Sequence, residues 1–345
     1  MLEPTPYELL AEVFVVEDYC VLIDGWAGEK AWVLGINPTE IREFNGYDDV
    51  QSIAHNLKEL AMTYGDDMVG RERGFWGGAV ALLAYPDVKC KTMSQKHKIS
   101  IKPAIHLAQY PVVARFVKGK WDIVGATKNF PVLTQKLEHY INKLRKQKKM
   151  KSLGNAEKES FTRTKLLVQA EEYQAWVQNA IAKIKAGELW QVNLAHPIYV
   201  QGNENLANLY KRVATHSPSP WGAFYSTPDF AVLSNSPEIL LGSEGSKIWT
   251  KPIAGTRPRH TDSVQDKLLK QSLEKSYKDR AEHLMTVDLL RNDMGKISQA
   301  GSIELKLLAA VEEYQNVFHI VSVLRAELTK DKTQLDALNA VLIVC

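Results

Sequence analysis

The sequence predicts an α+β fold with a sizeable hydrophobic core. Of its 345 residues, 45% are hydrophobic and 24% are charged, an ordinary globular balance that excludes a disordered or collagen-like chain. Short apolar runs and longer runs of helical periodicity occur in blocks. This order favours α+β over a doubly wound sheet, in which strands and helices alternate regularly. The length corresponds to one large domain or two smaller ones, at roughly 150 residues per domain.

The first region, residues 1–150, is expected to be mainly β. Apolar runs bounded by turn residues such as Asp24-Gly25 and Lys118-Gly119-Lys120 indicate short strands. In chain order, these strands are expected at 13–16, 20–23, 31–34, 75–85, 111–117 and 121–124. Helices are expected at 50–64, from the spacing of its apolar residues, and at 132–150, which ends in a basic run.

A polar segment at 151–165 is the predicted linker to a second region. This region opens with a helix at 170–186, whose apolar residues fall on one stripe and which Gly187 terminates. Alternation in a strand at 189–195 places Gln191 and Asn193 on the same face. The remaining elements are expected as a short helix at 206–214, strands at 221–226, 230–234, 239–242 and 247–250, a long helix at 263–290, and a strand at 317–322.

The charge balance and the cysteine content restrict the class of protein. The 43 basic and 40 acidic residues leave a net charge of +3, which gives no indication of nucleic acid or a membrane as partner. The basic run at 143–151 is best explained as a solvated helix end. No apolar stretch approaches the roughly 20 residues of a membrane helix, and the N-terminus lacks a secretion signal. With only three scattered cysteines, a cytoplasmic, reducing location is expected.

Several polar residues occupy positions suited to chemistry, although each has an ordinary structural explanation. The segment 251–259, KPIAGTRPR, offers a glycine, a hydroxyl and two guanidinium groups suited to carboxylates, but it also fits a well-built turn. Glu282, within a helix, needs a cation or metal if it is buried, and none if it lies on a solvated flank. Glu238 ends a strand as a turn cap or a general acid. His319 lies in an apolar strand, where a lone histidine is more often a core residue than a catalyst.

Taken together and in order, five motifs closely resemble those of the chorismate-utilising enzymes. They are QVNL at 191–194, SPE at 236–238, TKPIAGTRPR at 250–259, EHLMTVDLLRND at 282–293 and HIVS at 319–322. That family includes anthranilate synthase component I, aminodeoxychorismate synthase component I, and the isochorismate and salicylate synthases. The resemblance implies a large antiparallel β-sandwich with helices on the outer faces. It makes 1–150 an N-terminal region and 166–345 a chorismate-binding region.

The resemblance implies roles for individual residues. Family members bind chorismate, a dicarboxylate with a hydroxyl on ring carbon C4, together with Mg²⁺. Glu282 matches a ligand of that metal, which draws electrons into the ring as the hydroxide leaves. Glu238 matches the general acid near the C4 hydroxyl, and His319 matches a residue that assists its departure. Gly255 and Thr256 match contacts to the ring carboxylate.

Gln191 bears on the nucleophile. Family members that add water have a lysine base at this position, whereas glutamine has no basic nitrogen, so the resemblance implies ammonia from a glutaminase partner. Asn193 resembles aminodeoxychorismate synthase, which makes 4-amino-4-deoxychorismate for folate synthesis, and anthranilate synthase is the alternative. Against this choice, Ala254 stands where some aminodeoxychorismate synthases carry a nucleophilic lysine. With alanine there, direct attack by ammonia is implied.

Two further expectations concern regulation and completeness. Asp24 lies near where family members line a tryptophan pocket, and Pro220 and Trp221 resemble its second wall. Beyond the segment like 335–341, the family continues with a glycine-rich stretch, a second metal-binding glutamate and closing strands, which the residues up to 345 do not match. We therefore expect a C-terminally truncated chain with little activity and poor solubility. A non-catalytic remnant that docks a glutaminase subunit is a further alternative.

Overall fold

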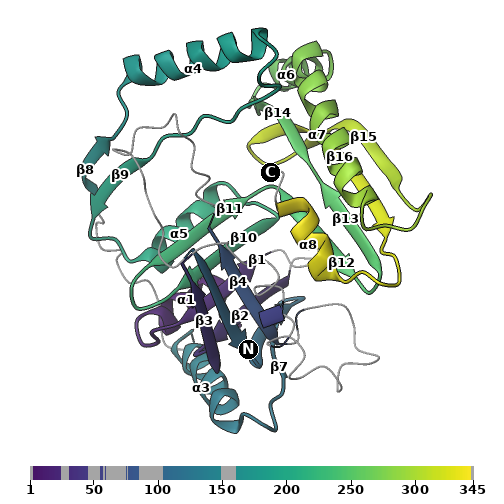
Figure 1. The fold of residues 1–345 in the computed structure, drawn as a ribbon. Coiled ribbons are helices and arrows are strands. Elements are labelled where there is room, and N and C mark those ends of the chain that lie inside the picture. Colours follow the sequence, from purple (N-terminus) through teal and green to yellow (C-terminus); the bar gives the residue numbers. More distant parts are fainter. Residues whose placement is uncertain are drawn as a thin grey trace.

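The computed structural model describes residues 3–24, 31–45, 55–56, 59, 75, 77–84, 104–148 and 161–342. Its sheets are antiparallel, with helices packed against them, which confirms the predicted α+β class and the antiparallel architecture (Figure 1). The predicted helix at 50–64 falls largely outside the described residues, as does most of the predicted linker. No helix in the described ranges is both long and apolar enough to cross a membrane.

A six-stranded sheet joins the two predicted regions of the chain. Its strand order is β11-β10-β1-β2-β6-β7. The strands are β1 (Cys20–Asp24), β2 (Ala31–Ile36), β6 (Val112–Val117), β7 (Lys120–Gly125), β10 (Trp221–Ser226) and β11 (Ala231–Ser236). The junction is the pairing of β1 with β10, in which Cys20 lies opposite Ser226 and Ile23 opposite Ala223. Residues some 200 positions apart in the sequence are therefore neighbours in one sheet.

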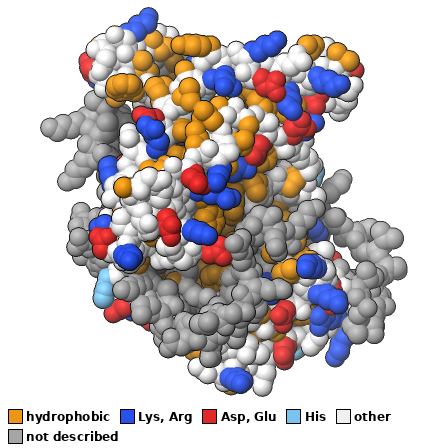
Figure 2. Space-filling view, turned by 90° about the vertical axis from the view of Figure 1, so that its right-hand side faces the viewer, with side chains coloured by type: hydrophobic (Ala, Val, Ile, Leu, Met, Phe, Trp, Pro, Cys, Tyr) orange, Lys and Arg blue, Asp and Glu red, His pale blue; other side chains and the backbone are white. Residues whose placement is uncertain are grey.

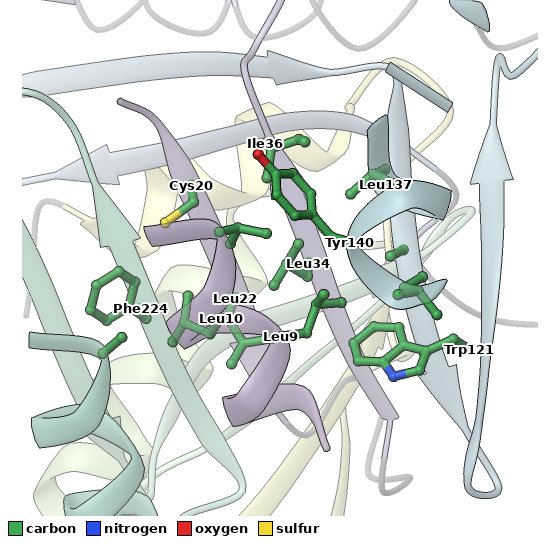
Figure 3. Packing of buried hydrophobic residues seen from close by; sticks show 14 of the residues in the cluster. Leu9, Leu10, Cys20, Leu22, Leu34, Ile36, Trp121, Leu137, Tyr140 and Phe224 are labelled. Atoms are coloured by element: carbon green, nitrogen blue, oxygen red, sulfur yellow. The ribbon is translucent and has the colours of Figure 1, made fainter. Parts of the chain in front are cut away.

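The main hydrophobic core lies between this sheet and three helices. The helices are α1 (Pro6–Phe14), α3 (Pro131–Lys148) and α5 (Leu206–His216). Fully buried side chains from the helices and the sheet meet here, among them Leu9, Leu22, Leu34 and Phe224 (Figure 3). Because Phe224 comes from β10 and Leu9 from α1, the N-terminal and central parts of the chain bury their apolar surface together.

A five-stranded sheet carries the motifs singled out in the second region. Its strands are β12 (Ile239–Glu244), β13 (Lys247–Lys251), β14 (Ile253–Pro258), β15 (Glu304–Glu313) and β16 (Val317–Glu327). The long strand β16 is central: β13 and β14 pair with it along one edge, and β15 pairs with it along the other. Helices α6 (Ser263–Glu274), α7 (Tyr277–Gly295) and α8 (Gln334–Leu342) accompany this sheet.

Two smaller sheets complete the described strands. The first contains β3 (Glu40–Phe44), β4 (Gly78–Leu83) and β5 (Ile105–Tyr110), and β5 is buried along its whole length. The second is the pair β8 (Phe161–Leu166) and β9 (Ile198–Gly202). Strand β8 occupies the end of the segment predicted as a linker.

The strand predicted at 13–16 is wrong, because Val13 belongs to the last turn of α1. The helix is fixed at its start, where the Thr5 hydroxyl accepts a hydrogen bond from Glu8 N–H and the Glu8 carboxylate accepts one from Thr5 N–H. Pro6 takes the first helical position, where its missing N–H is harmless. This reciprocal cap sets a helical register that buries Val13.

The single helix predicted at 263–290 is also wrong, because it is two helices. Lys275 ends α6, and the Ser276 hydroxyl caps the start of α7 by accepting a hydrogen bond from Asp279 N–H. A serine at this position satisfies a backbone N–H that a continuous helix would have paired differently. The break turns the second helix so that Val287, Leu290 and Met294 are buried.

Helix α4 (Ala170–Lys185) forms as predicted, but its apolar stripe is not buried. Gly187 follows it with a φ of +75°, the left-handed conformation expected after a helix end. None of its residues is buried, and Ile181 and Ile184 are 39% and 42% exposed. Together with β8 and β9 it extends away from the two large sheets (Figure 1).

The strand predicted at 189–195 is wrong, because the segment between α4 and β9 pairs with no other described strand. It contains Trp190, which is 83% exposed, and Gln191, which is exposed as well. An alternating pattern becomes a strand only when a neighbour completes its hydrogen bonds.

Elsewhere on the surface, hydrophobic side chains gather in a band across the face seen in Figure 2.

Candidate active site

Three neighbouring strands place a hydroxyl, an imidazole and a carboxylate in one row. On β14, β16 and β15, Thr256 lies opposite His319, and His319 lies opposite Glu312. Direct cross-strand partners project from the same face of a sheet. The other face carries Phe318 and Ile320, which belong to the core beneath α6. The alternation of β16 thus separates a polar face from a packed one.

A β-bulge at Gly255 aims two oxygen atoms at His319. The register between β14 and β16 shifts between Ala254 and Thr256, so Gly255 is the extra residue, with a φ of +64°. The Gly255 carbonyl lies 3.2 Å from His319 Nδ1, and the Thr256 hydroxyl lies 3.0 Å from it. Because a carbonyl only accepts, this contact assigns the proton to Nδ1 and leaves Nε2 with the lone pair in the neutral ring.

Replacing Gly255 with Ala is expected to destabilise the protein by more than left-handed backbone strain alone. That strain amounts to about 1–3 kcal/mol for a residue with a side chain. A Cβ at Gly255 would also lie 2.9 Å from Asp279 Cβ and 3.0 Å from Leu273 Cδ1. Gly245→Ala is the matched control, because Gly245 has a φ of +58° and nothing within 4 Å of an added Cβ. If both variants lost the same free energy of unfolding in urea, the close approach of Gly255 to Asp279 and Leu273 would be refuted.

Glu238 joins the polar face from the connection between β11 and β12. Its Oε1 accepts a hydrogen bond of 2.8 Å from Ile253 N–H, at the start of β14. The Ser236 hydroxyl holds the turn by accepting from Glu238 N–H at 3.1 Å. Burial raises the pKa of the Glu238 carboxyl and outweighs the opposing effects of the Ile253 N–H and of His319. The residue stays accessible to solvent, as a group that meets a substrate must be.

Lys251, Glu312 and Tyr314 surround His319 and were not foreseen as site residues. Lys251 Nζ donates to Glu312 Oε2 at 2.7 Å, and the Tyr314 hydroxyl donates to the same oxygen at 3.1 Å. The Tyr314 ring meets the His319 ring edge to face, with centroids 5.2 Å apart. Burial and the neighbouring Glu312 carboxylate raise the pKa of Tyr314. No local motif marks Glu312, because only the register of β15 places it beside the histidine.

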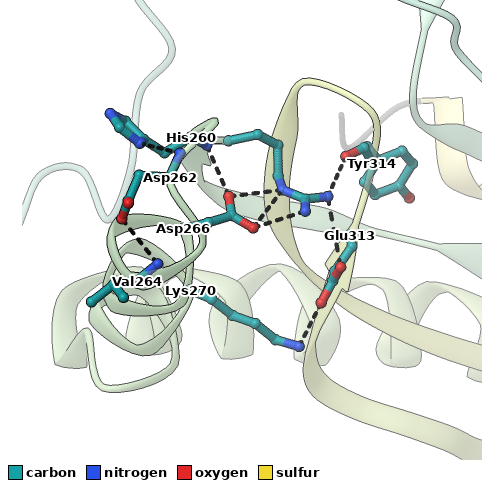
Figure 4. Close-up of polar contacts among 8 residues, drawn as sticks. His260, Asp262, Val264, Asp266, Lys270, Glu313 and Tyr314 are labelled. Atoms are coloured by element: carbon teal, nitrogen blue, oxygen red, sulfur yellow. Dashed lines mark hydrogen bonds and ion pairs between the residues drawn. The ribbon is translucent and has the colours of Figure 1, made fainter.

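A cluster on the other face fixes the turn that carries Tyr314. Arg259 forms a two-pronged ion pair with Asp266 and donates to the Tyr314 carbonyl at 3.1 Å. Glu313 accepts from Lys270 at 2.9 Å and lies 3.6 Å from Arg259. Figure 4 shows these side chains tying α6 to the β15–β16 turn. Arg259 holds the pKa of Asp266 below its usual range, which keeps the pair charged.

The structure does not bring every predicted residue to the row. Ala254 pairs with Ile320, which places it on the packed face. Gln191 lies exposed in the segment before β9, and none of the hydrogen bonds found among the described residues joins it to Glu238 or His319. Only Glu238, Thr256, Gly255 and His319 are therefore gathered in one place.

Glu282, the predicted metal ligand, lies on α7. Its side chain is 36% exposed, and its carboxylate lies 3.3 Å from Nζ of Lys278, one turn earlier. In the described ranges, no three side chains of His, Cys, Asp or Glu are grouped to hold a metal ion. A single accessible carboxylate fits Mg²⁺, which keeps several waters and takes substrate oxygens as further ligands.

The residues predicted to line a tryptophan pocket lie on adjacent strands of the six-stranded sheet. Asp24 ends β1, Trp221 begins β10 next to Pro220, and Asp24 accepts a hydrogen bond of 2.9 Å from the Tyr7 hydroxyl. A Cβ added to Gly222 would lie 3.4 Å from Asp24 Cβ. Asp24 is half-buried and hydrogen-bonded to Tyr7, and tryptophan binding stays a prediction.

Two side chains of the basic run, Lys143 and Arg145, form ion pairs with acidic residues of the N-terminal segment. Lys143 pairs with Glu12 at 2.5 Å, and Arg145 pairs with Glu3 at 2.9 Å. These ion pairs tie α3 to the N-terminal segment and reduce the positive charge that a nucleic acid would meet, in line with the expectation of a solvated helix end.

Comparison with protein families gives one match over most of the chain. The model of the family described as chorismate binding enzyme matches residues 22–342. Among solved structures, anthranilate synthase component I from Streptococcus pneumoniae has a similar fold, with a TM-score of 0.73 and 23% identity. That similarity covers 91% of this chain and 72% of the other.

Two curated relatives give different product names. The anthranilate synthase component 1 of Aquifex aeolicus is 32% identical over 314 residues, which is 87% of this chain and 62% of the relative. The aminodeoxychorismate synthase component 1 of Bacillus subtilis is 38% identical over 170 residues, which is 47% of this chain and 35% of the relative. The chain therefore spans less than two thirds of the length of these relatives.

Proposed function

The chain belongs to the family of chorismate-binding enzymes, and on that premise we propose that it aminates chorismate with ammonia to give 4-amino-4-deoxychorismate. One observation carries the proposal: Glu238, with its raised pKa, stands over the same sheet face as His319 and Thr256. A carboxyl that keeps its proton nearer neutral pH can act as a general acid toward a leaving hydroxyl. Gln191 and Asn193 support ammonia as the nucleophile.

In the proposed reaction the protein side chains bind, orient and move one proton. Thr256 and the backbone at Gly255 bind the ring carboxylate. Glu238 gives its proton to the C4 hydroxyl, which leaves as water while the ammonia nitrogen bonds to C4, and the ammonium group so formed returns one proton to the Glu238 carboxylate. His319 presents Nε2 to the same hydroxyl, because Nδ1 is committed to the Gly255 carbonyl. A glutaminase partner would supply the ammonia.

By the family resemblance Glu282 is the residue that would hold Mg²⁺, and the only partner found for its carboxylate among the described residues is Lys278. The bound ion supplies positive charge that offsets the substrate carboxylates and favours departure of the hydroxyl. Glu282 can turn toward it because its present partner, Lys278, is a solvent-exposed lysine whose ion pair is weak. The rest of the coordination would come from water and substrate oxygens.

Anthranilate formation is the second candidate. The Aquifex aeolicus relative, which matches most of this chain, is named anthranilate synthase component 1. The two reactions share chorismate and ammonia but differ in the product: anthranilate has lost the enolpyruvyl group as pyruvate, whereas aminodeoxychorismate retains it. The active-site row accommodates both chemistries, because both begin with departure of the C4 hydroxyl.

The test combines product analysis with binding. The purified chain is incubated with chorismate, an ammonium salt and Mg²⁺, and products are identified by mass spectrometry while calorimetry measures chorismate binding. An aminated product that retains the enolpyruvyl group supports the proposal, and anthranilate supports the second candidate. Chorismate binding without turnover supports the non-catalytic alternative. Absence of both turnover and binding contradicts the proposal and the second candidate.

A further inference from the structure

We propose that Glu312, held by Lys251 and Tyr314, is a positioning residue for the His319 ring. The inference deepens the proposed function, which gives His319 its role. It begins from the row across the sheet, where His319 has Thr256 on one flank and Glu312 on the other. Direct antiparallel partners have Cβ atoms about 4.5–5.5 Å apart, within reach of a glutamate side chain.

The Glu312 carboxylate has an asymmetric set of partners. Lys251 Nζ and the Tyr314 hydroxyl both donate to Oε2. Strands β13 and β15 lie on opposite edges of β16, so the Lys251 side chain reaches across the central strand on the His319 face. Such a spanning ion pair places equal and opposite charges on the sheet face that carries His319.

Tyr314 transmits the position of this pair to the ring. Its hydroxyl donates a hydrogen bond to Glu312, and its carbonyl accepts one from Arg259. Its ring meets the His319 ring edge to face, with centroids 5.2 Å apart. On the far side, Nδ1 is held by Gly255 and Thr256. The imidazole is thus fixed from both sides and keeps Nε2 directed to the open face.

Four charged or titratable groups lie on the His319 side of the sheet or contact its ring. They are Lys251 from β13, Glu312 from β15, Tyr314 from the turn and Glu238 from the β11–β12 connection. Two of these groups, Lys251 and Glu312, carry compensating charges. Removing one member of that pair therefore leaves the other uncompensated beside the ring, and the sign of the effect depends on which member is removed.

The test is an NMR titration of histidine-labelled protein, in which His319→Gln identifies the His319 signal. Lys251→Met is expected to raise the midpoint of the His319 titration, because Glu312 then favours the charged ring. Glu312→Gln is expected to lower the midpoint by a similar amount, because Lys251 then disfavours that charge. The double variant should return close to the parent.

Three controls separate this electrostatic role from a structural one. Lys251→Arg keeps the charge and should keep the parent midpoint. Lys247→Met makes the same charge change on the same strand, about 13 Å away at roughly 3.3 Å per residue, and should have no effect. Tyr314→Phe keeps every charge and should leave the midpoint in place while loosening the ring contact. An unchanged midpoint in both single variants, or shifts of the same sign, overturns the inference.

The titration uses no chorismate and no turnover. Loss of the proposed amination therefore leaves this result intact, and a failed titration leaves the proposed function standing on Glu238 and Thr256. The two proposals can fail separately.

Discussion

Replacing Glu238 with Gln is expected to lower turnover of chorismate by about 10²–10⁴-fold, the usual contribution of a general acid. Glutamine keeps the oxygen that accepts from Ile253 N–H, so the local turn is preserved, but it has no proton to give. Chorismate binding should change little, because the ring carboxylate is bound elsewhere. The measurement is kcat and KM for amination of chorismate, and a variant that keeps the parent kcat would remove Glu238 from the mechanism.

Relative to the parent protein, the same variant should become more stable as the pH rises. Because the pKa of Glu238 is raised in the folded protein, the folded state binds this proton more tightly than the unfolded chain. The stability that this proton contributes is present at low pH and is lost as the pH rises through the raised pKa. Glutamine does not ionise and escapes that loss.

Urea unfolding at pH 5 and pH 8 measures this effect. The free energy of unfolding of Glu238→Gln, relative to the parent, should be more favourable at pH 8 than at pH 5. Glu138→Gln on α3 is the control, because that carboxylate is exposed and lies far from the site. A Glu238→Gln difference that is the same at both pH values would show that burial does not penalise the charged carboxylate.

Replacing Phe224 with Ala is expected to destabilise the folded protein by about 3–5 kcal/mol. The side chain is fully buried and meets Phe14 and Tyr210, with ring centroids 5.3 Å and 5.8 Å away. These partners come from α1 and α5, so the cavity would open where the two parts of the chain join. Phe224→Leu, which fills most of the volume, should lose much less.

Urea unfolding followed by both far-ultraviolet circular dichroism and tryptophan fluorescence checks this prediction. Because the six-stranded sheet takes strands from both regions, the two probes should shift to lower urea together. Val132→Ala is the control, since Val132 is exposed on α3. A loss confined to one probe, or below about 1 kcal/mol, would show that the two regions do not share this core.

The sequence predicted helices and strands best where their hydrophobic residues had a strong periodicity or where a turn residue marked the end of the element. Helix α4 and its terminal Gly187 were predicted within a residue or two, as were the hairpin strands β6 and β7. The cap at Thr5 was equally readable, because threonine, proline and glutamate follow the usual order, yet the apolar run at 13–16 outweighed it. The break at Ser276 was missed because helical periodicity continues across it.

The site residues likewise fall into those that a local motif marks and those that only long-range strand pairing places. Glu238, Thr256 and His319 could be found because each lies in a motif with a distinctive order of residues. Glu312 could not, because its neighbour in space is set by pairing between β15 and β16, and that strand carries two register shifts before the pairing becomes regular. A long-range register of this kind is not encoded in any short window of sequence. The face on which Ala254 lies depends likewise on the bulge at Gly255.

The exposed arm of α4, β8 and β9 has a thermodynamic consequence. A helix of 16 residues with no fully buried side chain is only marginally stable by itself, because its nucleation is unfavourable and little tertiary packing offsets it. Its backbone amides should therefore exchange with solvent through local opening that leaves both large sheets intact. Hydrogen exchange in this arm would report its own small opening free energy, while that of β10 or β16 would report the opening of the whole fold.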